Sequence, residues 1–303
     1  MVEKLDIKLP FRVPKSLEPR IREFKYGLKL LNKNKLSMIG GLVILGFIII
    51  AIFAPFVALY PEDAGSVNKI QNQLQPPSFE HPFGTDRFGR DIFSRIVYGA
   101  RISLYIGIVA IGLALLIGVP LGALAGSIGG YVDEAIMRVV DTFLSFPPLL
   151  LALAISAALG PTLTNMMIAI AIAWWPWYTR IIRGEALSVK EKPFIEAAKA
   201  MGESKVKIAF KHVLPNSITG VIVQSSMDFG SIIITAASLS FLGLGAQSPT
   251  PEWGRIIASH RDYFLTQWWT VVFPGLIILI FVFSFNIFGD GLRDILDPKT
   301  RRE

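Results

Sequence analysis

Six apolar stretches, each close to the length of a membrane-spanning helix, set the strongest limit on how this 303-residue chain can fold. A spanning helix needs about 20 mostly apolar residues. The composition fits such a fold, because 52% of the residues are hydrophobic and only 17% are charged, outside the range of soluble globular domains. We therefore predict an all-α polytopic membrane protein with six transmembrane helices. The six windows lie near 39–59, 102–126, 140–159, 164–182, 217–244 and 268–289.

The basic residues indicate the orientation of these helices. Ten Lys and Arg precede the first window against four acidic residues, seven lie in the loop 183–216, and four follow residue 290. Short loops rich in Lys and Arg stay in the cytoplasm, so we expect both termini and the 183–216 loop to be cytoplasmic. The net charge of +7 is then a topology signal. No nucleic-acid partner is expected, because the charge is spread over three segments and forms no single groove.

The same signals divide the chain into five parts. Before the first window, apolar residues recur at steps of four and three between basic ones, a pattern typical of an amphipathic helix on the membrane surface; a plain positive-inside anchor explains the segment equally well. That apolar set is Leu17, Ile21, Phe24, Leu28 and Leu31. The expected parts are a cytoplasmic segment 1–38, a first transmembrane helix 39–59, an external loop 60–101, a five-helix core 102–290 with the cytoplasmic loop 183–216, and a cytoplasmic tail 291–303.

The external loop holds a charged stretch, His81 to Asp91, that leads into a helical pattern. By residue type alone, His81, Asp86 and Asp91 resemble a metal cluster. We do not expect a metal there, because Arg87 and Arg90 lie among the supposed ligands and their charge opposes a cation. The chain also has no cysteine, which excludes disulfides, thiol catalysis and thiolate metal sites.

Two features of the second and third windows predict helix packing. Glycines at strict four-residue spacing strip one helix face of side chains, which lets another helix approach closely. They are Gly118, Gly122, Gly126 and Gly130. In the third window, which Pro147-Pro148 interrupts, Asp141 lies three residues after Arg138, so we expect an ion pair between these two side chains within one helix.

The 183–216 loop is polar and helix-forming. Pro193 suits a first helical turn, Gly202 a helix stop, and Ser204 the cap of a second short helix that we expect Pro215 to end. The resulting apolar faces have no core of their own, which favours a groove in another protein; packing against the chain's own helix ends is the alternative. The expected faces are Phe194, Ala197, Ala198 and Met201 on the first helix and Val206, Ala209, Phe210 and Val213 on the second.

These residues carry a resemblance. Glu196-Ala197-Ala198, Gly202 six positions after the glutamate, and the closing Leu214-Pro215 resemble the "EAA" loop of type I ABC importer permeases. His212 stands where that loop usually has an apolar residue, and His-Val-Leu-Pro-Asn is similar to the dipeptide/oligopeptide/nickel subfamily. The resemblance to the C-type permease of that subfamily extends from about residue 35 to 297. Its further elements are 81–91, Arg101-Ile102-Ser103-Leu104, Arg138 with Asp141, and Ser240 to Gly245.

The resemblance implies a coupling helix that docks into a cleft of a separate ABC ATPase. The chain lacks a Gly-x-x-x-x-Gly-Lys-[Ser/Thr] motif, so ATP and Mg are expected on partner subunits and this chain is expected to be neither enzyme nor metal protein. Implied partners are two ATPase subunits, a B-type permease that completes a heterodimer, and an extracytoplasmic substrate-binding protein in a prokaryotic inner membrane. The residues assigned to coupling are Glu196, Ala197, Ala198, Met201, Gly202, Phe210, Leu214 and Pro215.

Polar residues inside the spans are candidates for the translocation path, because such residues are costly in lipid and usually face a cavity or a partner. Gln224, Ser225, Asp228 and Asn286 are the candidates; a structural role for Asp228 is an equal alternative. The subfamily implies di- or oligopeptides, with nickel or oligosaccharides as alternatives. Two other classes fit less well. An ion-coupled carrier calls for inverted repeats, and an intramembrane hydrolase would need Asp141 and Asp228 together.

Overall fold

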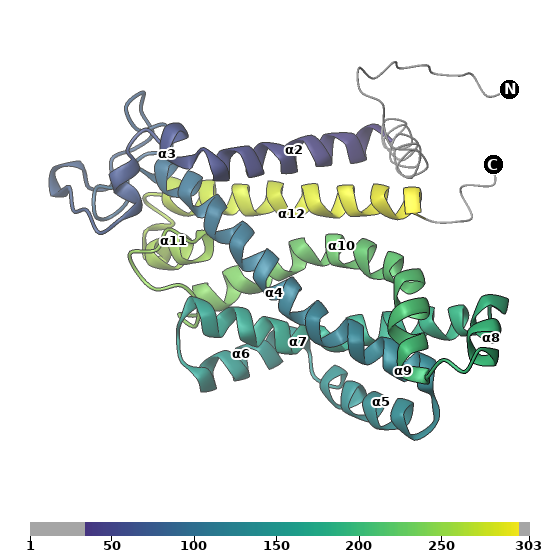
Figure 1. Ribbon diagram of the computed structural model, residues 1–303. Coiled ribbons are helices and arrows are strands. Elements are labelled where there is room, and N and C mark those ends of the chain that lie inside the picture. Colours follow the sequence, from purple (N-terminus) through teal and green to yellow (C-terminus); the bar gives the residue numbers. More distant parts are fainter. Residues whose placement is uncertain (1–33, 297–303) are drawn as a thin grey trace, which may run out of the picture.

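The structure, a computed structural model, describes residues 34–296 (Figure 1). No strand occurs in this part of the chain, where the main elements are all helices. The amphipathic helix predicted over 17–31 and the last seven residues of the tail lie outside the described residues. The helices are α2 (Lys35–Ile52), α3 (Ala54–Val57), α4 (Ile92–Ile128), α5 (Gly130–Leu144), α6 (Pro148–Leu159), α7 (Leu163–Lys190), α8 (Pro193–Ala200), α9 (Lys205–Ile208), α10 (Leu214–Phe241), α11 (Trp253–His260) and α12 (Trp269–Leu296), with a π-helical turn at Ala209–Val213 and short 3₁₀ turns at Pro61–Ala64, Ile70–Asn72 and Arg261–Tyr263.

Four helices of the described region are long and apolar enough to cross a membrane: α2, α4, the continuous helix Lys205–Phe241 and α12. A fifth span results if α5 and α6, which are bent by 88° at their junction, count as one. The predicted count of six is therefore not confirmed by length and apolarity alone. The third window is broken where Pro147 precedes α6, and the fourth lies in α7, whose tryptophans and arginines lower its hydropathy.

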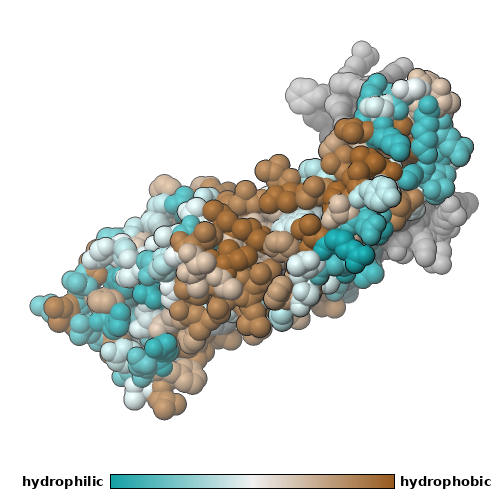
Figure 2. Space-filling model, turned by 90° about the horizontal axis from the view of Figure 1, so that it is seen from below, coloured by the Kyte–Doolittle hydropathy of each residue, from teal (hydrophilic) through white to brown (hydrophobic). Residues whose placement is uncertain are grey.

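The helices form an elongated bundle with two different ends (Figure 1). Helices α2 and α12 run side by side, and the long α4 crosses the bundle and packs along α7. The main core fills the space between α4, α7 and α10 with residues such as Ala110, Tyr178 and Ile232. The start of α2, the end of α12 and α8–α9 lie at one end, here called the α8 end; loop 60–91 and α11 lie at the opposite end. Figure 2 shows a hydrophobic belt between these two hydrophilic ends.

The predicted glycine seam is confirmed for three of its four members. A Cβ on Gly118 or Gly122 would lie 2.5 Å from a backbone carbonyl oxygen of α7, that of Trp175 or Thr179, and one on Gly126 would lie 2.6 Å from Ala186 Cβ. The glycines thus let the two backbones meet with no side chain between them. Gly130 does not belong to the seam. It begins α5 with a φ of +60°, and no atom would lie within 4 Å of its Cβ.

The ion pair predicted between Arg138 and Asp141 is wrong. Asp141 instead pairs with Arg180 of α7, and Arg138 pairs with Glu134 within α5. One turn along α7, Arg183 holds Asp133 in a two-bond fork, Nε to Oδ1 at 2.5 Å and Nη2 to Oδ2 at 2.7 Å. These two ion pairs fasten α5 across α7, an arrangement that residue spacing within α5 cannot reveal.

Candidate functional site

The ends of α8 form as the sequence predicts. Pro193 occupies the first turn, where its missing N–H loses no hydrogen bond. At the other end Gly202 has a φ of +79°, Gly202 N donates to Lys199 O at 2.9 Å, and Glu203 N donates to Ala198 O at 3.2 Å. This pair of bonds is a Schellman motif, which satisfies the last carbonyls of the helix. Ser204 Oγ then accepts from Lys207 N at 3.3 Å and caps α9.

The two faces of α8 differ in their surroundings. Ile195 and Ala198 are fully buried against Ala186 and Val189 at the end of α7. Phe194 and Met201 are 42% and 74% exposed. The prediction that Ala198 shares an unpartnered face with these two residues is therefore wrong. A small core of the chain itself covers one side of α8, and the other side is open.

The second helical segment divides in the same way, with Ala209 and Val213 buried and Val206 and Phe210 exposed at 51% and 40%. It also does not end at Pro215. The π-helical turn carries the chain directly into α10, with Pro215 in the first turn of that helix, where no N–H is needed. The four exposed apolar side chains are called here the α8 patch: Phe194, Met201, Val206 and Phe210.

The remaining residues assigned to coupling lie around this patch. Glu196, Ala197 and Gly202 are exposed on α8 and its C-terminal turn, and Pro215 is exposed at the start of α10. Leu214 is half-buried against the main core. The structure thus brings most of the predicted coupling residues to one surface at the α8 end, and places Ala198 and Leu214 beneath it.

Glu203 connects the elbow after α8 to the following segment, a role that the sequence did not indicate. Its carboxylate lies 2.9 Å from Lys207 Nζ, 3.4 Å from Lys211 Nζ and 2.6 Å from His212 Nε2. Hydrogen bonds from Lys207 and then His212 lower the pKa of Glu203 from its ordinary value to about 2. His212 therefore has a partner within the chain, which accounts for a polar residue at this position.

Of the four predicted path residues, the structure joins two. Gln224 Nε2 donates to Asp228 Oδ1 at 2.9 Å on α10, whereas Ser225 Oγ bonds to Ile222 O of its own helix. Asn286 is exposed on α12. Gln224 also lines a groove of about 850 Å³ between α7, α10 and α12, which none of the other three lines.

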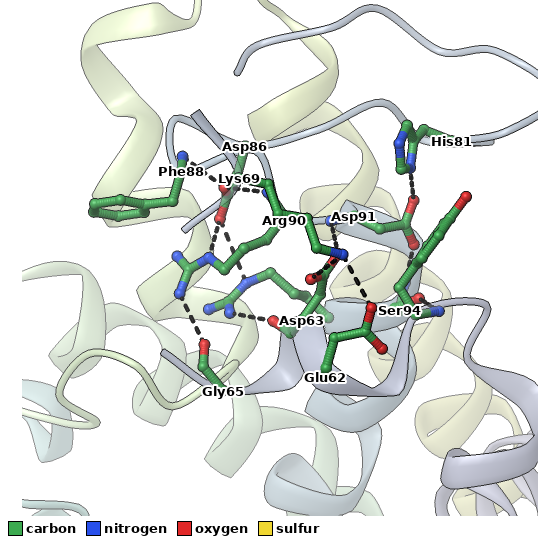
Figure 3. A network of polar contacts seen from close by, with 12 residues as sticks. Glu62, Asp63, Gly65, Lys69, His81, Asp86, Phe88, Arg90, Asp91 and Ser94 are labelled. Carbon is green, nitrogen blue, oxygen red and sulfur yellow. Dashed lines mark hydrogen bonds and ion pairs between the residues drawn. The ribbon is translucent and has the colours of Figure 1, made fainter. Parts of the chain in front are cut away.

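At the opposite end, loop 60–91 is held by a buried charge network (Figure 3). The Asp86 carboxylate accepts from the backbone N–H groups of Phe88 and Arg90 at 2.8 and 3.0 Å and pairs with Arg90 Nε at 2.7 Å. Arg95 donates to Asp63 O at 2.9 Å and to Pro249 O at 3.1 Å. Loop 60–91, the start of α4 and the loop before α11 are thereby tied together.

Asp91 occupies the start of α4 in the same network. Its Oδ2 accepts from Ser94 N at 2.7 Å as an N-cap, and its Oδ1 lies 3.0 Å from His81 Nδ1. Asp63 Oδ2 accepts the N–H of Asp91 at 2.8 Å (Figure 3). The acidic residues that resembled metal ligands are thus engaged by arginine, histidine and backbone N–H groups. Within residues 34–296 no group of three His, Cys, Asp or Glu is placed to hold a metal.

Comparison with known proteins assigns the chain to a family. Residues 118–302 match the family described as "Binding-protein-dependent transport system inner membrane component". The chain belongs to this family. Residues 24–77 additionally match the "N-terminal TM domain of oligopeptide transport permease C". These matches cover the chain from the last turns of α4 through α12, and the first span with part of loop 60–91.

Several relatives in this family are similar over nearly their whole length. The dipeptide transport system permease protein DppC of Alkalihalophilus pseudofirmus is 48% identical over 95% of this chain and 94% of its own. The probable D,D-dipeptide transport system permease protein DdpC of Escherichia coli K12 is 45% identical over 89% of this chain and 90% of its own. The glutathione transport system permease protein GsiD of Pectobacterium atrosepticum is 42% identical over 97% and 96%.

A chain of the MetNI methionine ABC transporter, solved in inward-facing conformations, is similar in fold. It has a TM-score of 0.53 at 18% sequence identity, covering 66% of this chain and 96% of that chain. At this identity the likeness shows the type I ABC importer permease fold alone. The chain is therefore a helical membrane permease component of a binding-protein-dependent transport system.

Proposed function

We propose that this chain is the C-type permease subunit of an ATP-driven importer of short peptides in a prokaryotic cytoplasmic membrane. The observation that carries the proposal is the 48% identity to a dipeptide permease over 95% of the chain. Relatives named for D,D-dipeptide and glutathione transport, at 45% and 42% identity, support a peptide substrate rather than nickel or an oligosaccharide. The chain would form half of the path, beside a B-type permease.

The α8 patch supports docking of an ATPase at this end. Exposed apolar side chains that lie outside the lipid belt call for a partner groove, and Phe194 and Met201 project from a helix whose other face is fixed to α7 through Ile195 and Ala198. A docking helix with its own packed core moves with the spans. Hydrolysis of ATP with Mg would take place on the two partner ATPases, leaving this chain non-catalytic.

Six spans with both termini cytoplasmic remain the topology that fits best. Helix α7 has 28 residues, about 42 Å at 1.5 Å per residue, which exceeds the hydrocarbon thickness. Because α4, α6 and α10 pack against it, part of its surface never meets lipid, so it tolerates lower apolarity. With α5–α6 as a broken span, six crossings place the start of α2 and the end of α12 on one side, as in Figure 1. The 60–91 loop would then face the substrate-binding protein.

Affinity purification of the tagged chain from its native membranes tests the proposal. The wild-type chain is expected to bring down an ABC ATPase and a second permease. Met201→Glu and Gly202→Asp, at exposed positions, should each lose the ATPase and keep the permease. Leu265→Glu, 92% exposed at the opposite end, is the matched control and should retain both partners.

Two results would contradict this function. One is a wild-type chain that purifies alone or only with copies of itself, which would favour an ion-coupled carrier. The other is ATPase retention by both α8 variants together with unchanged substrate-stimulated ATP hydrolysis, which would move the coupling contact elsewhere.

A further inference from the structure

The groove between α7, α10 and α12 has the features of a ligand site. Its volume of about 850 Å³ lies within the roughly 300–1,000 Å³ of small-molecule pockets. It is lined by the last turns of α7, the first turns of α10 and the end of α12, all of which reach the α8 end in Figure 1. Its lining combines charged and amide side chains with apolar ones such as Val223 and Met227.

Three charged side chains from three elements converge on this groove. Glu185 comes from α7, Lys192 is the residue before α8, and Arg293 comes from the last turns of α12. Among the described residues, the ion pairs of Asp133, Asp141 and Glu203 at this end of the molecule involve none of these three. All three side chains are exposed, so their charged groups are accessible to a ligand that enters the groove from the α8 end.

Two amide side chains add hydrogen-bonding capacity to the same wall. Asn216 Nδ2 donates to His212 O at 2.7 Å, and Gln224 Nε2 donates to Asp228 Oδ1 at 2.9 Å. Each amide therefore keeps a carbonyl oxygen with no hydrogen bond to a described residue, and such an oxygen accepts the N–H of a ligand. The groove offers one anionic group, two cationic groups and two acceptors.

We propose that this groove binds a short zwitterionic peptide at the α8 end of the permease, with Glu185 contacting the α-ammonium group and Lys192 and Arg293 the α-carboxylate. This inference rests on the proposed function, and gives that permease a second peptide contact apart from the predicted path residues Ser225, Asp228 and Asn286. A zwitterion matches a groove with both signs of charge, whereas an anionic lipid headgroup is opposed by Glu185.

The position of Lys192 connects peptide binding in the groove to α8. Lys192 directly precedes Pro193, the first residue of α8, so a peptide carboxylate held by Lys192 touches the start of the helix that we propose as the ATPase contact. Occupancy of the groove is thereby linked to the placement of α8.

The test measures binding of a radiolabelled alanyl–photo-leucine dipeptide to the purified transporter complex in nanodiscs, without nucleotide. The same dipeptide N-acetylated, and the same dipeptide as its C-terminal amide, are the competitors that lack one charge each. Because a hydrogen bond to a charged group contributes about 1.5–3 kcal/mol, the wild type should prefer the zwitterion by about 10-fold or more. Photocrosslinks should fall on the lining segments of α7, α10 and α12.

Variants assign each contact. With Glu185→Gln, the zwitterion should lose its advantage over the acetylated dipeptide and keep its advantage over the dipeptide amide. With Arg293→Gln, the zwitterion should keep its advantage over the acetylated dipeptide and lose part of its advantage over the amide, because Lys192 still binds the carboxylate. Glu191→Gln and Arg138→Gln are matched controls outside the groove and should behave as wild type. This crossed pattern requires direct contact, because a purely structural effect lowers binding of all three compounds equally.

A substitution that fills the groove tests the proposal independently of charge. A Cβ on Gly220 would lie 3.3 Å from Glu185 Oε1 and 3.6 Å from Ile181 Cγ2, so a larger side chain there enters the groove without meeting backbone. Gly220→Leu should reduce crosslinking at least about 10-fold, and Gly184→Leu, on an open face of α7, should not.

Failure of the proposed function and failure of the groove proposal give different results. Absence of an ATPase from the purified wild-type complex refutes the proposed function. An intact complex in which Glu185→Gln keeps full discrimination, or in which phosphatidylethanolamine in the nanodisc, whose headgroup is itself a zwitterion, displaces the dipeptide from crosslinks to α7, overturns the groove proposal.

Discussion

Replacing Gly122 by alanine tests the seam between α4 and α7, the most extensive helix pair of the described chain. The new Cβ would lie 2.5 Å from Thr179 O and 2.9 Å from Ile182 Cβ. Ordinary contact begins at 3.4 Å, so the helices must separate by 0.9 Å (3.4 minus 2.5). The obstructing atom belongs to backbone, and no rotamer change relieves it.

The magnitude follows from two opposing effects. Overpacking by a methyl group costs about 1–3 kcal/mol, while alanine in place of glycine favours a helix by about 1 kcal/mol. Gly112→Ala in the same helix isolates the second effect, because nothing lies within 4 Å of its Cβ. The two variants should therefore differ in stability by about 1–3 kcal/mol, with Gly122→Ala the less stable.

Detergent-solubilised chain, heated in steps and followed by fluorescence-detected size exclusion, measures the difference. Gly122→Ala should melt several degrees below Gly112→Ala, and Gly112→Ala at or above wild type. If the two variants melt together, backbone contact between α4 and α7 is not what holds the bundle.

Three further predictions concern charged groups. Glu203 has its pKa lowered to about 2 from an ordinary 4.5, so its bonds stabilise the elbow above pH 4.5 and are lost as the pH falls toward 2; the protection factors of the elbow amides, which are corrected for the intrinsic pH dependence of exchange, should fall over that window. Arg183→Asp should lower the melting temperature, and adding Asp133→Arg should restore most of the loss, because the double variant has the same pair with the charges exchanged. This pair is half-buried, so its contribution to stability should lie between that of an exposed and that of a buried ion pair, about 1–3 kcal/mol. Asp86→Asn should lower the stability of the protein by about 3–5 kcal/mol, because it leaves two buried arginines without their carboxylate. Asp262→Asn, at an exposed ion pair, is the control and should cause no measurable change. A small effect of Asp86→Asn would show that water reaches the network.

Local signals in the sequence predicted local structure well. Pro193 at a first turn, Gly202 at a helix stop and Ser204 as a cap all depend on backbone conformation within a few residues, and all three are confirmed. The same holds for the seam glycines, because a four-residue period defines a helix face whatever packs on it. The prediction was wrong for Gly130, because α4 ends before it, at Gly129, where the backbone has a positive φ.

Features that depend on distant residues could not be predicted. Asp141 had Arg138 one turn away, yet the fold brings Arg180 of another helix to it. The apolar residues of α8 looked alike by periodicity, and only the approach of α7 buries Ala198 and leaves Met201 exposed. Which side of an amphipathic helix a chain covers itself, and which it leaves for a partner, is a tertiary property.

Two features of the structure, the packing of α8 on α7 and the glycine seam, combine into a mechanical argument about α8. Ile195 and Ala198 are packed against the end of α7 without exposed surface, and α7 meets α4 backbone to backbone through Gly118 and Gly122. Packed interiors transmit displacement because they compress little, and a seam without side chains has no rotamers to absorb it. A partner that moves the α8 patch would therefore move α7 and α4 together.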